Sequence, residues 1–207
     1  MLINPKLDFK NIIDQLKSKK IVVVDNFFKN NTCAFLRLRM QHGKKFEDIY
    51  PDYKANNYNC KNDEITNQIV LDLKENLQLI NFQRAWSFIY NNKAFGVDFH
   101  ADPSLLNINI WVTPNECISD FNKNGLIICD KKPPETMKES EWNGNLGNKT
   151  YEFLEKEKAN FINIPYLYNR AIFFDGALFH KTNNVETKEG NENKRVSYTM
   201  LFGTQLQ

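Results

Sequence analysis

A histidine and a carboxylate stand two residues apart in the segment VDFHADPSLLNINIWV, which covers residues 97–112. The segment is largely apolar, which is typical of a strand. Because successive side chains of a strand point to opposite faces, we expect His100 and Asp102 to project from the same face. Together they could occupy two adjacent positions around one metal ion. A hydrogen-bonded surface pair, or a histidine buried in the core, remains open as the alternative.

The sequence contains only two other histidines that could complete such a site. His42 ends a helical pattern and is expected at the surface or at a helix end. His180 lies in NRAIFFDGALFHKT, where an Asp-Gly turn joins two apolar runs that resemble strands. Two imidazoles and one carboxylate on one side of a metal leave open coordination positions, the arrangement of non-haem Fe(II) oxygenases.

An arginine and a serine follow in KRVSYTMLFG, near the end of the sequence. Strand alternation places Arg195 and Ser197 on one face. The planar guanidinium matches a carboxylate with two parallel hydrogen bonds, and a serine hydroxyl can donate to the same group. An exposed arginine on a terminal strand is the alternative. The position of Arg195 after His180, in an apolar strand, favours a role in binding a carboxylate.

The order of His100-x-Asp102, His180 and Arg195-x-Ser197 resembles the Fe(II)- and 2-oxoglutarate-dependent dioxygenase superfamily. The resemblance covers about residues 82–203 and looks most similar to the prolyl-hydroxylase-like branch. Its landmarks are VDFHADPS, NGLIICDKKPP, NRAIFFDGALFHKT and RVSYTMLFG, and IVVVDNFF and YPDYKANNY are similar to the N-terminal support region of such enzymes.

This resemblance implies a double-stranded β-helix, or jelly-roll, with the metal between two sheets. It implies that His100, Asp102 and His180 bind Fe(II), and that Arg195, assisted by Ser197, binds the distal carboxylate of 2-oxoglutarate. O₂ would be the second co-substrate. The sequence departs from the pattern in two respects. Many prolyl hydroxylases have lysine where Arg195 stands, which weakens the analogy with them in substrate, and the stretch between His180 and Arg195 is long and polar.

Two further residues are candidates for the co-substrate pocket. Tyr90, ten residues before His100, could donate its hydroxyl to 2-oxoglutarate, or it could pack in the core. Asn109 shares a strand face with Asn107 and Trp111, and this face would either form a polar pocket wall or meet solvent. We assign Asn109 to the pocket.

The elements that would position these residues change in type along the chain. Residues 20–28 read as a strand, 30–43 and 62–80 as helices, and 44–58 as irregular. The apolar stripe of the second helix consists of Ile65, Ile69, Leu73 and Leu77. From residue 81 onward, short strands dominate, with a charged helix or turn at 150–158. The strands are expected at 82–90, 97–101, 105–113, 125–129, 159–164, 171–174, 178–181 and 195–202.

The sequence therefore predicts a mostly β fold with flanking helices: a jelly-roll, cupin-like core supported by N-terminal helices. We expect a single oxygenase domain over residues 1–207, in which 1–80 form the support region and 81–207 form the core. The polar stretch KTNNVETKEGNENK, residues 181–194, is expected to form a loop beside the site.

Composition places few limits on function. The 207 residues carry a net charge of +2, which neither requires nor excludes nucleic acid as a partner. No secretory signal or membrane-length apolar run is apparent. The four cysteines are scattered, which favours reduced thiols in a cytoplasmic protein over a zinc site or disulfides.

The sequence thus predicts a 2-oxoglutarate-dependent Fe(II) dioxygenase that hydroxylates a peptidyl or free amino acid or a small molecule, releasing succinate and CO₂. A non-catalytic jelly-roll module that binds a metal or ligand is the alternative. Nucleic-acid demethylation on the same fold is disfavoured, because no second arginine follows Arg195. The loops expected to select the substrate, at 44–59, 114–124 and 133–150, do not identify it.

Overall fold

The computed structural model describes residues 1–42, 48–58, 63–142 and 149–203. The expected helix ends at Gly43 and Asn62 lie outside the described residues, as does Cys60. The three described cysteines, Cys33, Cys117 and Cys129, are buried and free. No helix in the described ranges is long and apolar enough to cross a membrane.

The described helices are α1 (Phe9–Ser18), α2 (Asn30–His42), α3 (Glu64–Leu77), α4 (Glu139–Trp142) and α5 (Lys149–Lys156), with 3₁₀ turns at Asn115–Cys117 and Asn191–Asn193. The strands are β1 (Ile21–Val24), β2 (Asp48–Ile49), β3 (Tyr53–Tyr58), β4 (Phe82–Tyr90), β5 (Lys93–Ala94), β6 (Leu106–Trp111), β7 (Leu126–Cys129), β8 (Phe161–Ile164), β9 (Ala171–Phe174), β10 (His180–Thr182), β11 (Val185–Glu186) and β12 (Val196–Phe202).

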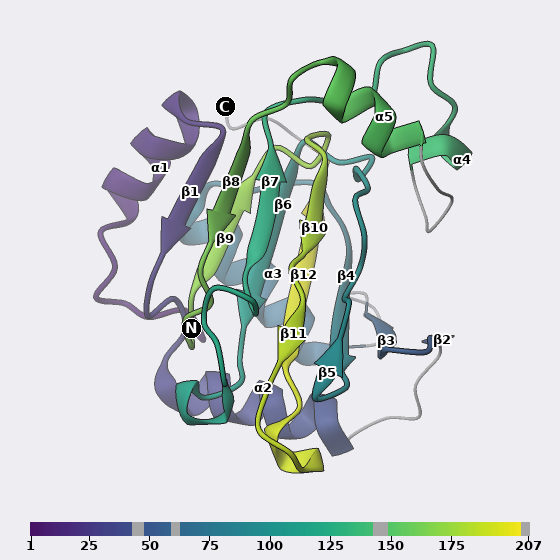
Figure 1. Cartoon of the computed structure of the whole chain (residues 1–207). Helices are drawn as coiled ribbons and strands as arrows, with labels where there is room; N and C mark the ends of the chain where they lie inside the picture. The colour runs from purple at the N-terminus through teal and green to yellow at the C-terminus, as the bar shows by residue number, and fades with distance from the viewer. Residues whose placement is uncertain (43–47, 59–62, 143–148, 204–207) are drawn as a thin grey trace.

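Two antiparallel sheets form the body of the protein (Figure 1). The larger sheet has the order β1-β9-β6-β12-β4-β3-β2, and the smaller has the order β10-β7-β8. β5 and β11 form a separate two-stranded ribbon. Most neighbours in the large sheet are far apart in sequence, whereas β2, β3 and β4, and likewise β7 and β8, are consecutive. The mostly β architecture expected from the short strand segments is confirmed.

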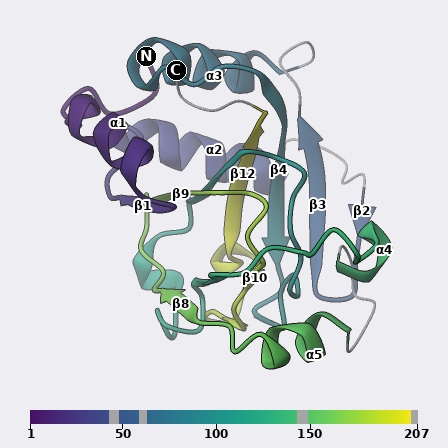
Figure 2. The same cartoon turned by 90° about the horizontal axis from the view of Figure 1, so that it is seen from above.

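The three N-terminal helices cover one face of the large sheet, and the small sheet lies across the other face (Figure 2). α3 shows why these residues form a helix. Asp63 caps its start by accepting a hydrogen bond from the backbone N–H of Thr66 at 3.0 Å, and Gln78 ends it in the left-handed conformation. The expected stripe packs into the core through Leu73 and its neighbours.

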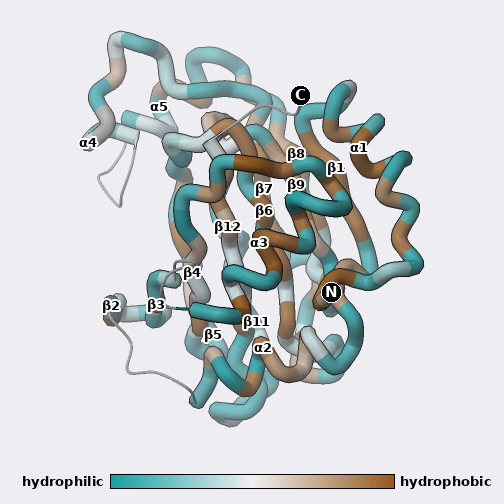
Figure 3. The backbone as a smooth tube through the Cα atoms, turned by 180° about the vertical axis from the view of Figure 1, so that it is seen from behind, coloured by the Kyte–Doolittle hydropathy of each residue, from teal (hydrophilic) through white to brown (hydrophobic). Residues whose placement is uncertain are grey.

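Strand alternation divides the large sheet into a helix-covered face and a face turned toward the small sheet. On β12, Val196, Tyr198 and Met200 belong to the core under the helices, whereas Ser197 and Thr199 point the other way. The tube view from behind shows apolar residues concentrated in the strands that these helices cover (Figure 3). The second face is therefore free to build a site between the two sheets.

Several sequence-based expectations were wrong. Residues 97–101 do not form a strand; within this segment only His100 makes an isolated antiparallel bridge, with His180. Residues 53–58, expected to be irregular, form β3, which pairs with β4 along its whole length. The polar tyrosine- and asparagine-rich sequence concealed this strand, because the pairing comes from its neighbour and not from an apolar alternation. The helix α1 was not anticipated.

Removal of the Leu73 side chain tests the packing of α3 against the large sheet. Leu73 is fully buried in the core, so Leu73→Ala should lower the free energy of unfolding by about 2–5 kcal/mol. Leu71, on the same helix, is 42% exposed, and Leu71→Ala should cost less than about 0.5 kcal/mol. Urea denaturation of both variants measures the difference, and equal losses would contradict this arrangement.

Candidate active site

His100, Asp102 and His180 converge although they come from distant segments. Their potential ligand atoms all lie within 4.8 Å of one another. His100 and His180 exchange two backbone hydrogen bonds, of 3.0 and 2.9 Å, and the backbone N–H of Asp102 donates to the carbonyl of Gly176 at 2.8 Å. Backbone pairing of residues 100–102 with β10 and the turn before it thus brings the three side chains together.

The carbonyl of Gly176 can accept this hydrogen bond from Asp102 only because residue 176 has no side chain. A Cβ atom at this position would lie 2.0 Å from Ser104 Oγ and 2.8 Å from Asn107 Oδ1. These two residues belong to a hydrogen-bonded chain that ends on the metal-site carboxylate, because Asn107 Nδ2 donates to Asp102 Oδ2 at 2.6 Å. Asn107 therefore fixes the orientation of the Asp102 carboxylate.

Both imidazoles are oriented by backbone carbonyls. Nδ1 of His100 lies 2.7 Å from the carbonyl oxygen of Asp98, and Nδ1 of His180 lies 2.8 Å from that of Leu178. A carbonyl oxygen can only accept, so each Nδ1 carries the proton and each Nε2 keeps its lone pair. This is the usual arrangement around metal-binding histidines. His180 Nε2 lies 3.4 Å from Asp102 Oδ2, on the side where an ion would lie.

The protonation states also suit a divalent cation. Burial, together with the nearby His180, lowers the pKa of His100 to about 4, so this imidazole is neutral at physiological pH. Burial alone would raise the pKa of Asp102, but the neighbouring His180 and His100 and the hydrogen bond from Asn107 outweigh it and hold that pKa below the ordinary range of a carboxyl. A carboxylate and a neutral imidazole are the forms of these groups that bind metal.

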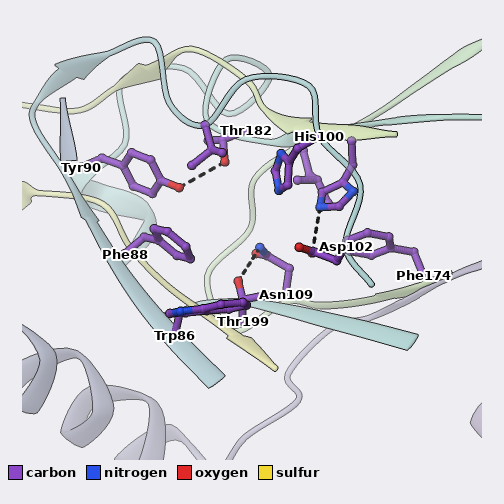
Figure 4. A pocket seen from close by; sticks show the side chains of 12 residues that line it. Trp86, Phe88, Tyr90, His100, Asp102, Asn109, Phe174, Thr182 and Thr199 are labelled. Atoms are coloured by element: carbon purple, nitrogen blue, oxygen red, sulfur yellow. Dashed lines mark hydrogen bonds and ion pairs between the residues drawn. The ribbon is translucent and has the colours of Figure 1, made fainter. Parts of the chain in front are cut away.

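A pocket opens beside the three side chains, between the two sheets (Figure 4). Trp86, Phe88 and Tyr90 line one wall from β4. The Tyr90 hydroxyl lies 3.2 Å from Thr182 Oγ1, and Asn109 Nδ2 donates to Thr199 Oγ1 at 3.0 Å. Thus the wall combines aromatic faces with a few fixed polar groups, as is usual for small-molecule sites.

The guanidinium of Arg195 is fully buried against this pocket wall. Its Cζ atom lies 4.9 Å from the ring centre of Tyr90, 5.6 Å from that of Trp111 and 5.7 Å from that of Tyr166. Among the described residues it forms no ion pair, and none of its three nitrogens makes a hydrogen bond of good geometry, although the Tyr90 side chain lies close enough to interact with it. Burial lowers the pKa of this group. A buried cation in this condition is costly unless an anion reaches it.

The structure brings most of the expected site residues to one region. Ser197 is buried on the same face of β12 as Arg195. Asn109 and Tyr90 line the pocket, and His42 ends α2 away from the metal-site cluster. The face of β6 that carries Asn107 and Trp111 points toward the pocket region and is buried, so it does not meet solvent.

Sequence reasoning missed part of the pocket wall, namely Trp86, Phe88, Phe174, Thr182 and Thr199. Strand parity could have found three of these positions. Trp86 and Phe88 alternate with the core-facing residues of β4 and share a face with Tyr90, as Thr199 shares a face with Ser197. Phe174 and Thr182 reach the pocket because strands far apart in sequence pair with one another. The alternation of side chains within one strand does not reveal such pairing.

Comparison with known proteins identifies the fold. No family model and no curated protein matches the sequence. A prolyl-4-hydroxylase from Pseudomonas putida is 10% identical with a TM-score of 0.57, covering 95% of this chain and 99% of that chain. HygX from Streptomyces hygroscopicus, solved with nickel and 2-oxoglutarate, is 9% identical with a TM-score of 0.60, covering 97% and 88%. A 2OG-Fe(II) oxygenase family oxidoreductase from Burkholderia pseudomallei is 11% identical with a TM-score of 0.58, covering 100% and 94%.

At these identities the likeness is one of fold. The chain has the jelly-roll fold of the 2-oxoglutarate/Fe(II) oxygenases over essentially its whole length. The fold implied by the sequence motifs is thereby confirmed, and a prolyl-4-hydroxylase is among the structural neighbours.

Replacement of Arg195 by methionine tests whether its charge lacks a protein partner. Arg195→Met should leave the free energy of unfolding unchanged or raise it by about 1–4 kcal/mol, because a buried unpaired cation is exchanged for an apolar chain. The control is Arg39→Met, since Arg39 pairs with the buried Asp63, and it should lose about 1–3 kcal/mol. A larger loss for Arg195→Met than for Arg39→Met, measured by chemical denaturation, would show that the protein itself neutralises Arg195.

Proposed function

We propose that this protein is an Fe(II)- and 2-oxoglutarate-dependent dioxygenase that hydroxylates a second organic substrate. One observation supports it most: a carboxylate and two imidazoles converge at a pocket lined by Tyr90, and against that ring lies the buried guanidinium of Arg195, which forms no ion pair among the described residues. The first group suits a divalent metal, and the second suits a carboxylate. 2-Oxoglutarate is a ligand that would use both, because it has a 2-oxo acid at one end and a carboxylate at the other.

The residues fit the metal in number, type and orientation. His100 Nε2, His180 Nε2 and an Asp102 oxygen would hold it, with Asn107 keeping the carboxylate in place. Fe(II), when bound there, would supply the redox chemistry that couples the oxidation of 2-oxoglutarate by O₂ to hydroxylation of the substrate. One oxygen atom would enter succinate, the other would enter the new hydroxyl group, and CO₂ would leave.

The remaining site residues bind and shield the co-substrate. Arg195 would form two parallel hydrogen bonds with its distal carboxylate, and Ser197 on the same strand face would assist. Tyr90 lies against the guanidinium and lines the pocket, so its ring and hydroxyl would border the co-substrate. Asn109 has a buried Oδ1 without a partner among the described residues, and we assign it to the same pocket. The aromatic rings of β4 would limit access of water.

Structural neighbours support this assignment. HygX was solved with nickel and 2-oxoglutarate, and the epimerase SnoN was solved with Fe³⁺ and alpha ketoglutarate. Because the identities are near 10%, these ligands come to this chain only as part of the proposal. The organisation as one domain over residues 1–207, and a cytoplasmic location, belong to the same proposal.

Loss of one metal ligand should abolish formation of the ternary complex. Anaerobic titration of the wild-type protein with Fe(II) and 2-oxoglutarate should give the visible charge-transfer absorption of the iron chelate. His100→Ala and Asp102→Ala should remove it, because a ligand is lost in each. His42→Ala is the matched control and should retain it, since His42 lies at the end of α2.

Two outcomes would count against the proposal. If His100→Ala retained the absorption band, the metal would be held elsewhere. If the wild-type protein bound Fe(II) but developed no band with 2-oxoglutarate, it would instead be a jelly-roll module that holds a metal without oxygenase chemistry.

Exchange of Arg195 for lysine tests the carboxylate clamp separately. Arg195→Lys keeps the charge but loses the planar fork, so the Kd of 2-oxoglutarate should rise on the order of tenfold while the metal affinity is unchanged. Titration of the absorption band with 2-oxoglutarate gives the first value, and calorimetric titration with Co(II) gives the second. Equal 2-oxoglutarate affinity in both proteins would place its distal carboxylate away from Arg195.

A further inference from the structure

A second groove, of about 490 Å³, lies beside the proposed metal centre. The backbone carbonyl of Asp98, which lines the groove, accepts the hydrogen bond of His100 Nδ1. Lys181 also lines the groove and directly follows His180. Tyr53 packs against Tyr90 of the metal-site pocket, with ring centres 5.5 Å apart. The groove therefore reaches the elements that hold two of the metal-site residues.

Aromatic rings form the walls of this groove. Tyr50 and Tyr53 stack with ring centres 4.5 Å apart and an angle of 21° between the planes. Phe95, which also lines the groove, is 80% exposed, and Tyr151 of α5 is 45% exposed. Large aromatic side chains gathered at the rim of a cavity, outside the core, are typical of a binding surface.

Two carboxylates stand among these rings. Asp52 Oδ2 accepts a hydrogen bond from the backbone N–H of Phe95 at 3.1 Å. Asp98 Oδ1 accepts one from the Tyr151 hydroxyl at 2.5 Å and another from the Phe99 N–H at 2.8 Å. In the part of the chain that the structure describes, neither carboxylate forms an ion pair, and the second oxygen of each makes no hydrogen bond.

Lys181 is the only cation among the described residues of the groove; aromatic rings hold it, and it forms no ion pair with the described carboxylates. Lys181 Nζ lies 4.7 Å from the ring centre of Phe99 and 5.8 Å from that of Tyr151. These rings therefore already accept an ammonium group through cation–π contact. The described lining keeps one excess negative charge, because two carboxylates face one ammonium.

These features favour one class of ligand. An anion would meet two carboxylates, and a purely apolar ligand would remove water from both without replacing its hydrogen bonds. A protonated amine or a guanidinium satisfies the free carboxylate oxygens and packs against the ring faces. We propose that this groove binds a protonated amine or guanidinium group of the primary substrate, with Asp52 and Asp98 as its counter-ions. This inference rests on the proposed function and adds the chemical class of the molecule to be oxidised.

Binding assays with matched probes test this inference on the full-length protein loaded anaerobically with Fe(II) and 2-oxoglutarate. One set consists of blocked short peptides that differ at a single central residue: Lys, Arg, Gln or Glu. A second set compares the free amine putrescine with the neutral 1,4-butanediol. Binding is followed by the perturbation of the charge-transfer band. Only cationic probes should bind. If the protein binds the cationic peptides more tightly than putrescine, the cationic group belongs to a peptide substrate, and the reverse order indicates a free amine.

Asp52→Asn and Phe95→Ala then test the groove itself. Each should raise the Kd of the cationic probe at least about fivefold and leave the band with 2-oxoglutarate unchanged, because neither residue is placed at the metal or at the 2-oxoglutarate clamp. Phe95 is mostly exposed, so its replacement leaves folding intact. The matched controls are Asp14→Asn on α1 and Phe35→Ala on α2, both exposed and away from the groove.

The outcomes separate the two proposals. The groove assignment is overturned if neutral or acidic probes bind as well as cationic ones, if no cationic probe binds the loaded protein, or if Asp52→Asn and Phe95→Ala leave the Kd unchanged. In each of these cases a normal band with 2-oxoglutarate would leave the proposed function standing. Absence of the band in the wild-type protein would instead contradict the proposed function.

Discussion

Backbone pairing between residues 100–102 and the segment 176–180 is the interaction on which the site depends. It consists of two hydrogen bonds between His100 and His180 and one from Asp102 to Gly176. Three short contacts thus join chain segments about eighty residues apart and set three potential metal ligands within 4.8 Å of one another. The two sheets and the helices give the site its rigid support. Without them, β10 and residues 97–102 would not be held in fixed positions relative to each other.

Electrostatics and packing on the inner face follow from the same arrangement. One face of the large sheet packs against α1, α2 and α3. The residues that alternate with this face along each strand, including the polar and charged ones, therefore point toward the small sheet. Arg195 is buried there among aromatic rings without an ion pair among the described residues, which would be destabilising in a purely structural arginine. A protein that retains such a group gains from it only when an anion binds. From this guanidinium and the oriented carboxylate–imidazole cluster we infer one ligand with two different ends, as proposed above.

Much of this site could be predicted from the sequence, although not always for the correct reason. The cluster of His100, Asp102 and His180 was predicted from residue type and order. Strand parity, which was used to align His100 with Asp102, fails because that segment is not a strand. Parity holds within strands that form, as for Trp86, Phe88 and Tyr90 of β4, which line one wall of the pocket. The pairing of Arg195 with Ser197 stays a prediction. The groove with its carboxylates and tyrosines was not foreseen, because β3 forms through pairing with β4 and its residues 53–58 lack the alternation that marks a strand.

The fate of molecular oxygen tests the central claim most directly. If the protein is supplied with Fe(II), 2-oxoglutarate and ¹⁸O₂, mass spectrometry should find one ¹⁸O atom in each succinate released, and none should be found with His100→Ala. Oxygen incorporation by the wild-type protein that depends on His100 would establish the site as an oxygenase centre. Succinate without label, or label that persists in His100→Ala, would contradict the account.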